Sequence, residues 1–360
     1  MRIVLGRRTL VDPGGTQTYA ATVAYQLERL GHDVTLATEV AGPFAELVRA
    51  RGTRVVHPDE LRGDVDVILG HDVVMTATLA ERYPDARVVF VSHSDSYDLQ
   101  LPPLVPGVVD AVVACSERMA SRVRASVLDA PIVRLREPID SDAYFATAPL
   151  PPKPRRALIL SNYLQGARRD RLVTAWEGAG IECVHVGTPG ELMLDPRPEI
   201  LGADIVVAKA RAALEGMCCG RAVYVYDQFG GDGWITADNY AAFEADHFAG
   251  QATDTPVTLE RLTADLADYS PDMGVVNHEL VRTHHAARRH AIDLVEVLRG
   301  PHPGPADRVE TLAELARLAR ATMRAELHAA EQDARAASAE RELASAQREV
   351  VAWRDRATEA

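Results

Sequence analysis

The chain has 360 residues, which is longer than one ordinary domain and predicts two domains of typical size with a remainder. Its 47% apolar and 25% charged residues are typical of a globular protein and exclude general disorder. The net charge of -13 argues against a broad nucleic-acid surface, which needs an excess of lysine and arginine. We therefore expect no nucleic-acid partner.

The cysteines predict neither disulfides nor a metal site. Cys115, Cys183, Cys218 and Cys219 form no CxxC pair and have no zinc-like spacing with histidine. Reduced thiols and a cytoplasmic location are therefore expected. The opening MRIVLG indicates a first strand rather than a signal peptide. No apolar run approaches the roughly 18 residues of a transmembrane helix.

Short apolar runs alternate with helical patterns over the first 148 residues. A buried strand is predicted at 2–6 and a helix at 18–30, with Gly31 at its end. Runs rich in valine and isoleucine suit parallel strands that are covered on both faces. Residues 1–148 are therefore predicted to form a Rossmann-like, doubly wound α/β domain. The further strands are expected at 34–38, 54–57, 66–70, 87–93, 110–116 and 132–135.

A proline-rich stretch interrupts this pattern at LPPKP and predicts a stiff linker over residues 149–155. A second βα series follows, so residues 156–300 are predicted to form a second Rossmann-like domain. Two such domains leave a cleft, where ligands bind at the carboxyl ends of the strands. The expected strands are 156–161, 181–187, 204–208 and 222–227, and the expected helices are 168–178, 210–219 and a long one at 273–299.

Residues 301–360 are predicted to be a helical tail. Apolar residues recur at three-to-four spacing along an alanine-rich seam, and acids and bases interleave on the rest. Two interpretations stay open, a solvated helix packed on the second domain and a coiled-coil arm that makes a homodimer. A membrane-surface helix is less favoured because the charges are mixed rather than basic.

Two features of the first domain lie where a ligand would bind. Gly14 and Gly15, in the sequence DPGGT, precede a helix whose N-terminus would favour an anion. A plain tight turn explains them equally well. His71 and His93 follow buried strands and would face the cleft, where a histidine can act on an acceptor hydroxyl or contact a sugar. Hydrogen-bonded loop histidines are the alternative.

The segment 203–239 is the most informative stretch of the second domain. Lys209 and Arg211 lie beside a predicted helix N-terminus and would offer positive charge to a diphosphate. Glu215 would accept hydrogen bonds from a ribose. A charged helix entry followed by a long turn is the alternative. A glycine-rich loop would let the backbone approach the ligand, through Gly230, Gly231 and Gly233.

In their shared order, these motifs resemble the GT-B glycosyltransferases, especially the large retaining branch. GGTQTY and LERLGHDVTLAT resemble the first βαβ unit of that family, and VVFVSHS resembles the strand that ends at an active-site histidine, here His93. DAVVACSERMASRV and LREPIDSDAYF resemble later segments of the first domain. ALEGMCCGRAVYVYD resembles the helix whose acid, here Glu215, typically binds the donor ribose. The resemblance covers about residues 1–300.

The sequence departs from the family pattern at two places. The acid that contacts the donor sugar is replaced by Val207, and the basic pair of the second domain is at best Arg168 and Arg169. The resemblance implies a metal-independent, retaining sugar transfer from a nucleotide-sugar to an unknown acceptor, without a cofactor. His93 and Asp95 would orient the acceptor or the sugar.

Two alternatives to this enzyme remain. The acid missing at Val207 motivates a non-catalytic GT-B-like protein that binds a glycan or a partner. A sugar-nucleotide epimerase would need acid and base carboxylates in the cleft, which the sequence does not place.

Overall fold

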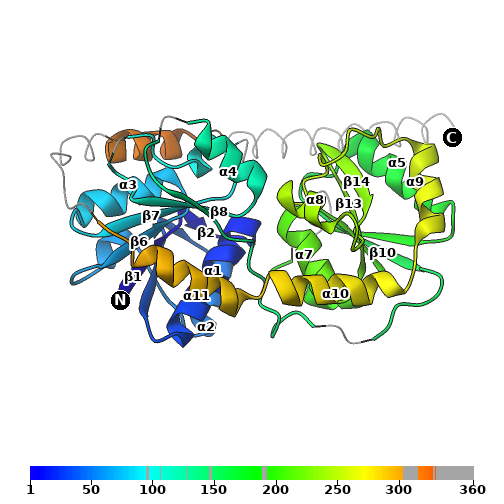
Figure 1. Ribbon diagram of the computed structural model, residues 1–360, viewed down its shortest axis with the longest axis horizontal. Coiled ribbons are helices and arrows are strands. Elements are labelled where there is room, and N and C mark those ends of the chain that lie inside the picture. The colour runs from blue at the N-terminus through cyan, green and yellow to red at the C-terminus, as the bar shows by residue number, and fades with distance from the viewer. Residues whose placement is uncertain are drawn as a thin grey trace, which may run out of the picture.

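The computed structural model describes residues 1–94, 97–105, 107–126, 128–145, 148–188, 193–302, 315–326 and 329. They form two α/β lobes that lie side by side (Figure 1). Every strand predicted from the sequence is present, with bounds that differ by at most two residues. The predicted fold class, two Rossmann-like doubly wound units, is confirmed.

The first lobe contains a seven-stranded parallel sheet in the order β5-β3-β1-β6-β7-β8-β9. A short parallel ladder, β2 with β4, lies beside it. The strands are β1 (Arg2–Gly6), β2 (Thr9–Leu10), β3 (Asp33–Ala37), β4 (Val40–Ala41), β5 (Arg54–Val56), β6 (Val67–Gly70), β7 (Arg87–Ser92), β8 (Ala111–Ala114) and β9 (Ile132–Arg134). The helices are α1 (Gly15–Arg29), α2 (Pro43–Ala50), α3 (Val73–Arg82) and α4 (Glu117–Arg124), with 3-10 turns η1 (Pro58–Glu60) and η2 (Asp98–Gln100).

Both faces of this sheet are buried, as the apolar strand sequences require. Along β1, Ile3 and Leu5 join a core with α1, while Val4 faces the opposite side and packs in a core with Met75 and Leu79 of α3. This alternation follows the two-residue period of a strand. Helices therefore cover both faces of the sheet. The loops that follow the parallel strands all lie at the carboxyl edge of the sheet.

The second lobe contains a five-stranded sheet in the order β11-β10-β12-β13-β14. Its first four strands are parallel, and β14 runs antiparallel to β13. The strands are β10 (Arg156–Leu160), β11 (Glu182–Val186), β12 (Ile205–Ala208), β13 (Ala222–Asp227) and β14 (Gly230–Trp234). The helices are α5 (Gly166–Glu177), α6 (Arg197–Leu201), α7 (Ala210–Cys218), α8 (Tyr240–Ala245), α9 (Leu259–Ala264) and α10 (Asp272–His284), with the 3-10 turn η3 (Asp265–Asp268).

The single helix predicted at 273–299 is wrong, because the structure has two helices there, α10 and α11 (Ala287–Leu298). The chain between them pairs with Ile139, which donates its N–H to the carbonyl of His285 at 2.8 Å and accepts from the N–H of Ala287 at 3.1 Å. This pairing takes backbone groups that a continuous helix would use internally.

Helix α11 returns to the first lobe (Figure 1). Ala291, Leu294 and Leu298 join the core formed with α1. The predicted range 156–300 therefore includes a helix that packs on the first sheet. Residues 149–155 contain no helix or strand, and Leu150 packs into the core of the second lobe. The domain boundaries stay predictions.

Ion pairs connect the lobes on the side of α4 and α8. Glu244 of α8, which is 3% exposed, pairs with Arg134 and with Arg136, the latter at 3.4 Å. Arg118 of α4 pairs with Asp246 at 2.8 Å. These contacts join first-lobe cations to second-lobe acids.

The described part of the tail, residues 315–326, is helical and packs on α3 of the first lobe (Figure 1). The interpretation that the tail packs on the second domain is therefore wrong for these residues. The coiled-coil homodimer stays a prediction, and the rest of its seam lies outside the described residues. Among the described residues, no helix combines the length and the apolar character needed to cross a membrane.

Candidate functional site

A cavity of about 920 Å³ lies between the two lobes. The loops that follow the strands line it, as expected at the carboxyl edges of two doubly wound sheets. The first lobe contributes Arg7 after β1 and His93 after β7. The second lobe contributes Asn162, Gly187 and Lys209, which follow β10, β11 and β12.

The N-termini of α1 and α7 approach each other across this cavity. Gly14 precedes α1 and Lys209 precedes α7, and neither of these N-cap residues caps its helix through a side-chain hydrogen bond. A Cβ placed on Gly15 would lie 3.9 Å from the Cβ of Arg211, so the two helix ends are close. Both helix dipoles favour an anion at this place.

The predicted residues Gly14, Gly15 and Lys209 all line the cavity. The Lys209 ammonium lies 4.3 Å from the ring centre of Tyr163 and 4.9 Å from that of Phe229. It is also 3.8 Å from a carboxylate oxygen of Asp227. Aromatic faces and an acid thus hold a cation beside the α7 N-terminus.

The backbone is strained at the start of α7. Ala210 has φ +49°, and nearby His247 and Phe248 have φ +60° and +51°, a region that side-chain-bearing residues rarely adopt. The N–H of Ala210 donates to the carbonyl of Phe248 at 3.2 Å. Because Ala210 and His247 line the cavity, the strain coincides with the candidate site, as it often does at functional positions.

Arg211 lines the cavity as the sequence predicted, but its charge is already paired. Its Nε donates to Glu215 at 3.1 Å, and its Nη1 donates to Glu137 at 2.8 Å and to the carbonyl of Pro138 at 2.9 Å. Its Nη2 donates to Thr22 of α1 at 3.1 Å. The guanidinium is thus enclosed by two acids, and it connects α7 to the first lobe.

Glu215 lines the cavity as predicted. Burial raises the pKa of its carboxyl, and the Arg211 guanidinium opposes that rise. Burial lowers the pKa of Arg211, but Glu137 and Glu215 more than compensate and the pKa is raised. Glu137 was not identified from the sequence, although it lies in the quoted LREPID segment.

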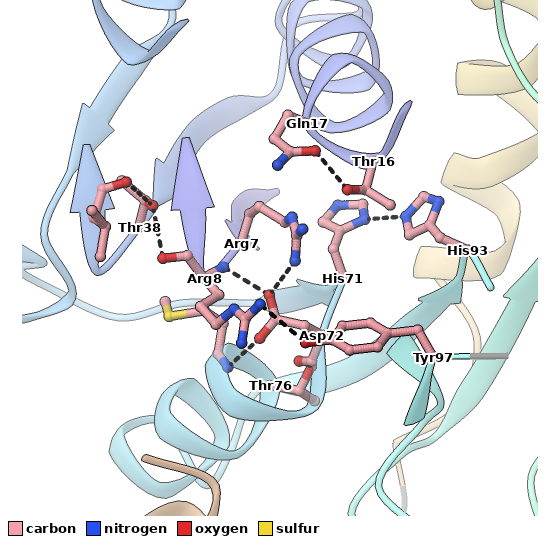
Figure 2. Close-up of polar contacts among 12 residues, drawn as sticks. Arg7, Arg8, Thr16, Gln17, Thr38, His71, Asp72, Thr76, His93 and Tyr97 are labelled. Atoms are coloured by element: carbon pink, nitrogen blue, oxygen red, sulfur yellow. Dashed lines mark hydrogen bonds and ion pairs between the residues drawn. The ribbon is translucent and has the colours of Figure 1, made fainter. Parts of the chain in front are cut away.

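His93 lines the cavity and forms a pair with His71 (Figure 2). A hydrogen bond of 2.9 Å joins Nδ1 of His71 to Nε2 of His93. The two imidazole rings are stacked on each other, and the ring of Tyr19 packs edge-on against both. Burial, with nearby Arg7, lowers the pKa of His71 to about 3, and burial also holds the pKa of His93 well below its usual range. Both histidines are therefore neutral at pH 7.

Arg7 and Arg8, directly after β1, line the cavity but were not predicted as site residues. Both donate to the same oxygen of Asp72, Arg7 through Nη1 at 3.0 Å and Arg8 through its backbone N–H at 2.7 Å (Figure 2). The other oxygen of Asp72 caps α3 by accepting from Met75 N–H. Their place directly after the first predicted strand is the feature of the sequence from which they could have been predicted as site residues.

Several predicted residues lie outside the cavity. Arg168 and Arg169 belong to α5 and do not line it; Arg169 donates to His185 at 3.0 Å. Asp95 lies outside the described residues.

The predicted glycine-rich loop is wrong, because it is strand β14. A Cβ on Gly230 would clash with the carbonyl of Gly250, and a Cβ on Gly231 would lie 2.7 Å from a ring carbon of Tyr226. These residues must be glycine for close packing. Gly230, Gly231 and Gly233 do not line the cavity.

Among the described residues, His93, Cys115 and Glu137 are grouped with ligand atoms within 4.8 Å of one another. Such a set could hold a metal ion in principle. Here Glu137 already accepts from the Arg211 guanidinium, and a second cation beside it would be repelled. The group therefore gives little support to a metal.

The fold is similar to that of solved structures that contain UDP or UDP-glucose. Anabaena Alr3699/HepE in complex with UDP and glucose is 12% identical, with a TM-score of 0.62, and covers 84% of this chain and 100% of its own. HepE with UDP-glucose has a TM-score of 0.60 at 12% identity over 83% and 99% of the two chains. LpCGTa in complex with UDP has a TM-score of 0.51 at 11% identity over 83% and 100%.

These similarities define the fold class of the chain as GT-B, two Rossmann-like lobes with a cavity between them. No protein-family model matches the sequence, and no curated protein sequence matches it either. The expected GT-B fold is confirmed by structure rather than by sequence.

Proposed function

We propose that this protein is a glycosyltransferase that moves a sugar from a nucleotide-sugar donor to an acceptor. One observation carries the proposal: two helix N-termini, from opposite lobes, meet beside Lys209 at a single cavity. That arrangement suits a diphosphate. The similar fold of HepE, whose structure contains UDP-glucose, supports a nucleotide-sugar as the donor.

The donor would bind mainly to the second lobe. Gly14 and Gly15 would bring the α1 N-terminus to the diphosphate, and Lys209 with the α7 N-terminus would bind it from the other side. Glu215 would accept a ribose hydroxyl, because its carboxylate lines the cavity and Arg211 holds it in place. In this proposal Arg211 orients Glu215 rather than binding phosphate.

The reaction breaks the bond between the sugar C1 and the diphosphate oxygen, and the electron pair leaves with the diphosphate. The acceptor oxygen bonds to C1, and its proton passes to the departing diphosphate. Lys209 and the helix N-termini would stabilise the charge that develops, so the proposed transfer needs no metal. Neutral His93 would position a hydroxyl through a hydrogen bond. Retention of configuration rests on the sequence resemblance.

We further propose that the reaction uses no cofactor and takes place in the cytoplasm. Cys115, Cys183, Cys218 and Cys219 are free, and reduced thiols are typical of that compartment.

Turnover is the direct test of this function. The intact protein is incubated with UDP-glucose, GDP-mannose, ADP-glucose and TDP-glucose, and the nucleoside diphosphate released is measured with and without EDTA. At least one donor should be consumed, by transfer or by slow hydrolysis, and EDTA should not reduce the rate. No release from any donor would contradict the enzyme.

The ribose assignment has its own test. Glu215→Gln should weaken nucleoside diphosphate binding by about tenfold, because a charged acceptor is lost. The matched control is Glu137→Gln, which removes the other acid from Arg211 and should change nucleotide affinity much less. Equal effects of the two substitutions would remove the ribose role.

A non-catalytic GT-B-like binding protein is the second candidate, and one observation favours it. Val207, at the position of the missing sugar-contacting acid, is fully buried in β12 within the core of the second lobe. Nucleotide binding without consumption of any donor would support this candidate.

A further inference from the structure

The tail helix reaches from α3 to the cavity. Residues 315–326 bury Ala319 and Met323 against α3, and Arg320 pairs with Glu81 of α3 at 3.2 Å. These contacts align the helix along the first lobe (Figure 1). Residues 315–326 therefore lie at a fixed place relative to the loops after β1 and β7.

Glu326 of this segment binds two residues that line the cavity. Its carboxylate accepts from Nη1 of Arg8 and from the hydroxyl of Tyr97, the latter at 2.7 Å. Arg8 Nη2 also donates to the Tyr97 oxygen at 3.2 Å. Both Arg8 and Tyr97 line the cavity. The carboxylate of Glu326 thus occupies a place where the Arg8 guanidinium and the Tyr97 hydroxyl both donate hydrogen bonds.

The first lobe holds Arg8 in place without the tail. Its backbone N–H donates to Asp72 at 2.7 Å, and its carbonyl accepts from Val40 N–H at 3.2 Å. Neighbouring Arg7 is 4% exposed, and its Nε has no partner among the described residues. Without Glu326, the two cations Arg7 and Arg8 would face a single acid, Asp72. This local excess of positive charge contrasts with the net charge of -13 of the whole chain.

Glu326 is held weakly enough to be replaced. Its side chain is 35% exposed, and ion pairs of such exposure add little to stability. A carboxylate or phosphate from solution offers Arg8 the same kind of partner. The planar guanidinium fits either group, and a phosphate carries more charge and more acceptor oxygens.

We propose that Arg8 and Tyr97 form a subsite for an acidic group of the acceptor, a carboxylate or a phosphate, and that Glu326 occupies this subsite until the acceptor binds. The inference rests on the proposed glycosyltransferase function, in which the first lobe binds the acceptor. The acceptor is then a negatively charged molecule rather than a neutral glycan.

Titration calorimetry on the full chain tests this subsite with glucose 6-phosphate, glucuronate and neutral glucose. At least one of the two acids should bind, and glucose should bind about tenfold more weakly or not at all. E326Q should bind the acid about fivefold more tightly, because an internal competitor is removed. R8Q should bind it about tenfold more weakly. E117Q removes an exposed acid from Arg124 outside the cavity and should bind as the wild type does.

If only glucose 6-phosphate or only glucuronate binds, the acidic group of the acceptor is identified as a phosphate or as a carboxylate. If both bind, the subsite accepts either anionic group. The proposal is overturned if neither acid binds, if E326Q binds no better than the wild type, or if R8Q binds equally well. Should R8Q fail to fold, Y97F, which lacks the hydroxyl donor, must weaken acid binding instead.

Nucleoside diphosphate binding, measured on the same proteins, separates this inference from the proposed function. Binding of UDP, GDP, ADP or TDP without an Arg8-dependent acid response would overturn the subsite alone. An Arg8-dependent acid response without any nucleotide binding would contradict the glycosyltransferase and, with it, the assignment of the acid to an acceptor.

Discussion

Lys209 is a residue of this site whose side chain is held in position by its neighbours. The ammonium lies over Tyr163 and Phe229 at the start of α7, so its position is fixed before any ligand arrives. Arg211, two residues on, is instead enclosed by acids. Both were predicted as phosphate ligands from sequence alone, because adjacency to a helix N-terminus does not reveal how closely acids enclose each cation.

Lys209→Ala should weaken nucleoside diphosphate binding by about tenfold or more, since a charged hydrogen bond to phosphate is lost. Titration calorimetry measures the change. Lys153→Ala is the matched control, because Lys153 is exposed in the linker and does not line the cavity. An affinity unaffected by Lys209→Ala would exclude this lysine from the site.

At the scale of elements, the site depends on where helices begin and which lobe they join. The sequence predicted both α1 and α7, although it began the first helix at residue 18 rather than at Gly15, because their apolar periodicity and flanking strands are local signals. It missed the break between α10 and α11, since that break is made by Ile139, which is distant in sequence. It also placed a ligand loop at β14, because glycines required for packing look the same as glycines required for a ligand.

The contacts between elements of opposite lobes give a stability prediction. Glu244→Gln leaves Arg134 and Arg136 without their acid at a buried position, so the free energy of unfolding should fall by about 1–3 kcal/mol. Urea denaturation measures it. Glu296→Gln, which removes an exposed partner of Arg299, should change stability by less than about 0.5 kcal/mol. Equal small effects would mean that the interlobe pairs are not stabilising.

At the scale of the whole molecule, buried histidines join distant segments of the chain, and the sequence identified two of them, His71 and His93, by position. His285 donates from Nδ1 to the carbonyl of Glu137 and accepts at Nε2 from the Tyr240 hydroxyl. His290 donates from Nδ1 to the carbonyl of Arg136 and accepts at Nε2 from the Tyr19 hydroxyl. Burial lowers the pKa of His285 to about 3 and that of His290 to about 4. These partners come from distant segments, so no local pattern predicts them.

The low pKa values predict acid-sensitive stability. His71, His285 and His290 have folded pKa values of about 3, 3 and 4, below about 6.5 in the unfolded chain. The unfolded state therefore binds more protons as the pH falls through 6.5, and stability is lost. Together they should lower the free energy of unfolding by about 4 kcal/mol between pH 7.5 and 5.5.

Urea unfolding at the two pH values measures this loss. His290→Gln should remove about 1.4 kcal/mol of it, because one buried imidazole no longer titrates. A free energy of unfolding that stays constant between pH 7.5 and 5.5 would show that these side chains are not buried and neutral.

The central claim is that the two lobes bind a diphosphate between the starts of α1 and α7. Titration calorimetry of the intact protein with UDP, GDP, ADP and TDP, each compared with its nucleoside, tests it most directly. We predict that at least one diphosphate binds about 100-fold more tightly than its nucleoside, because the phosphates make the charged contacts. Absence of binding by all four, or equal affinity for nucleoside and diphosphate, would contradict the claim.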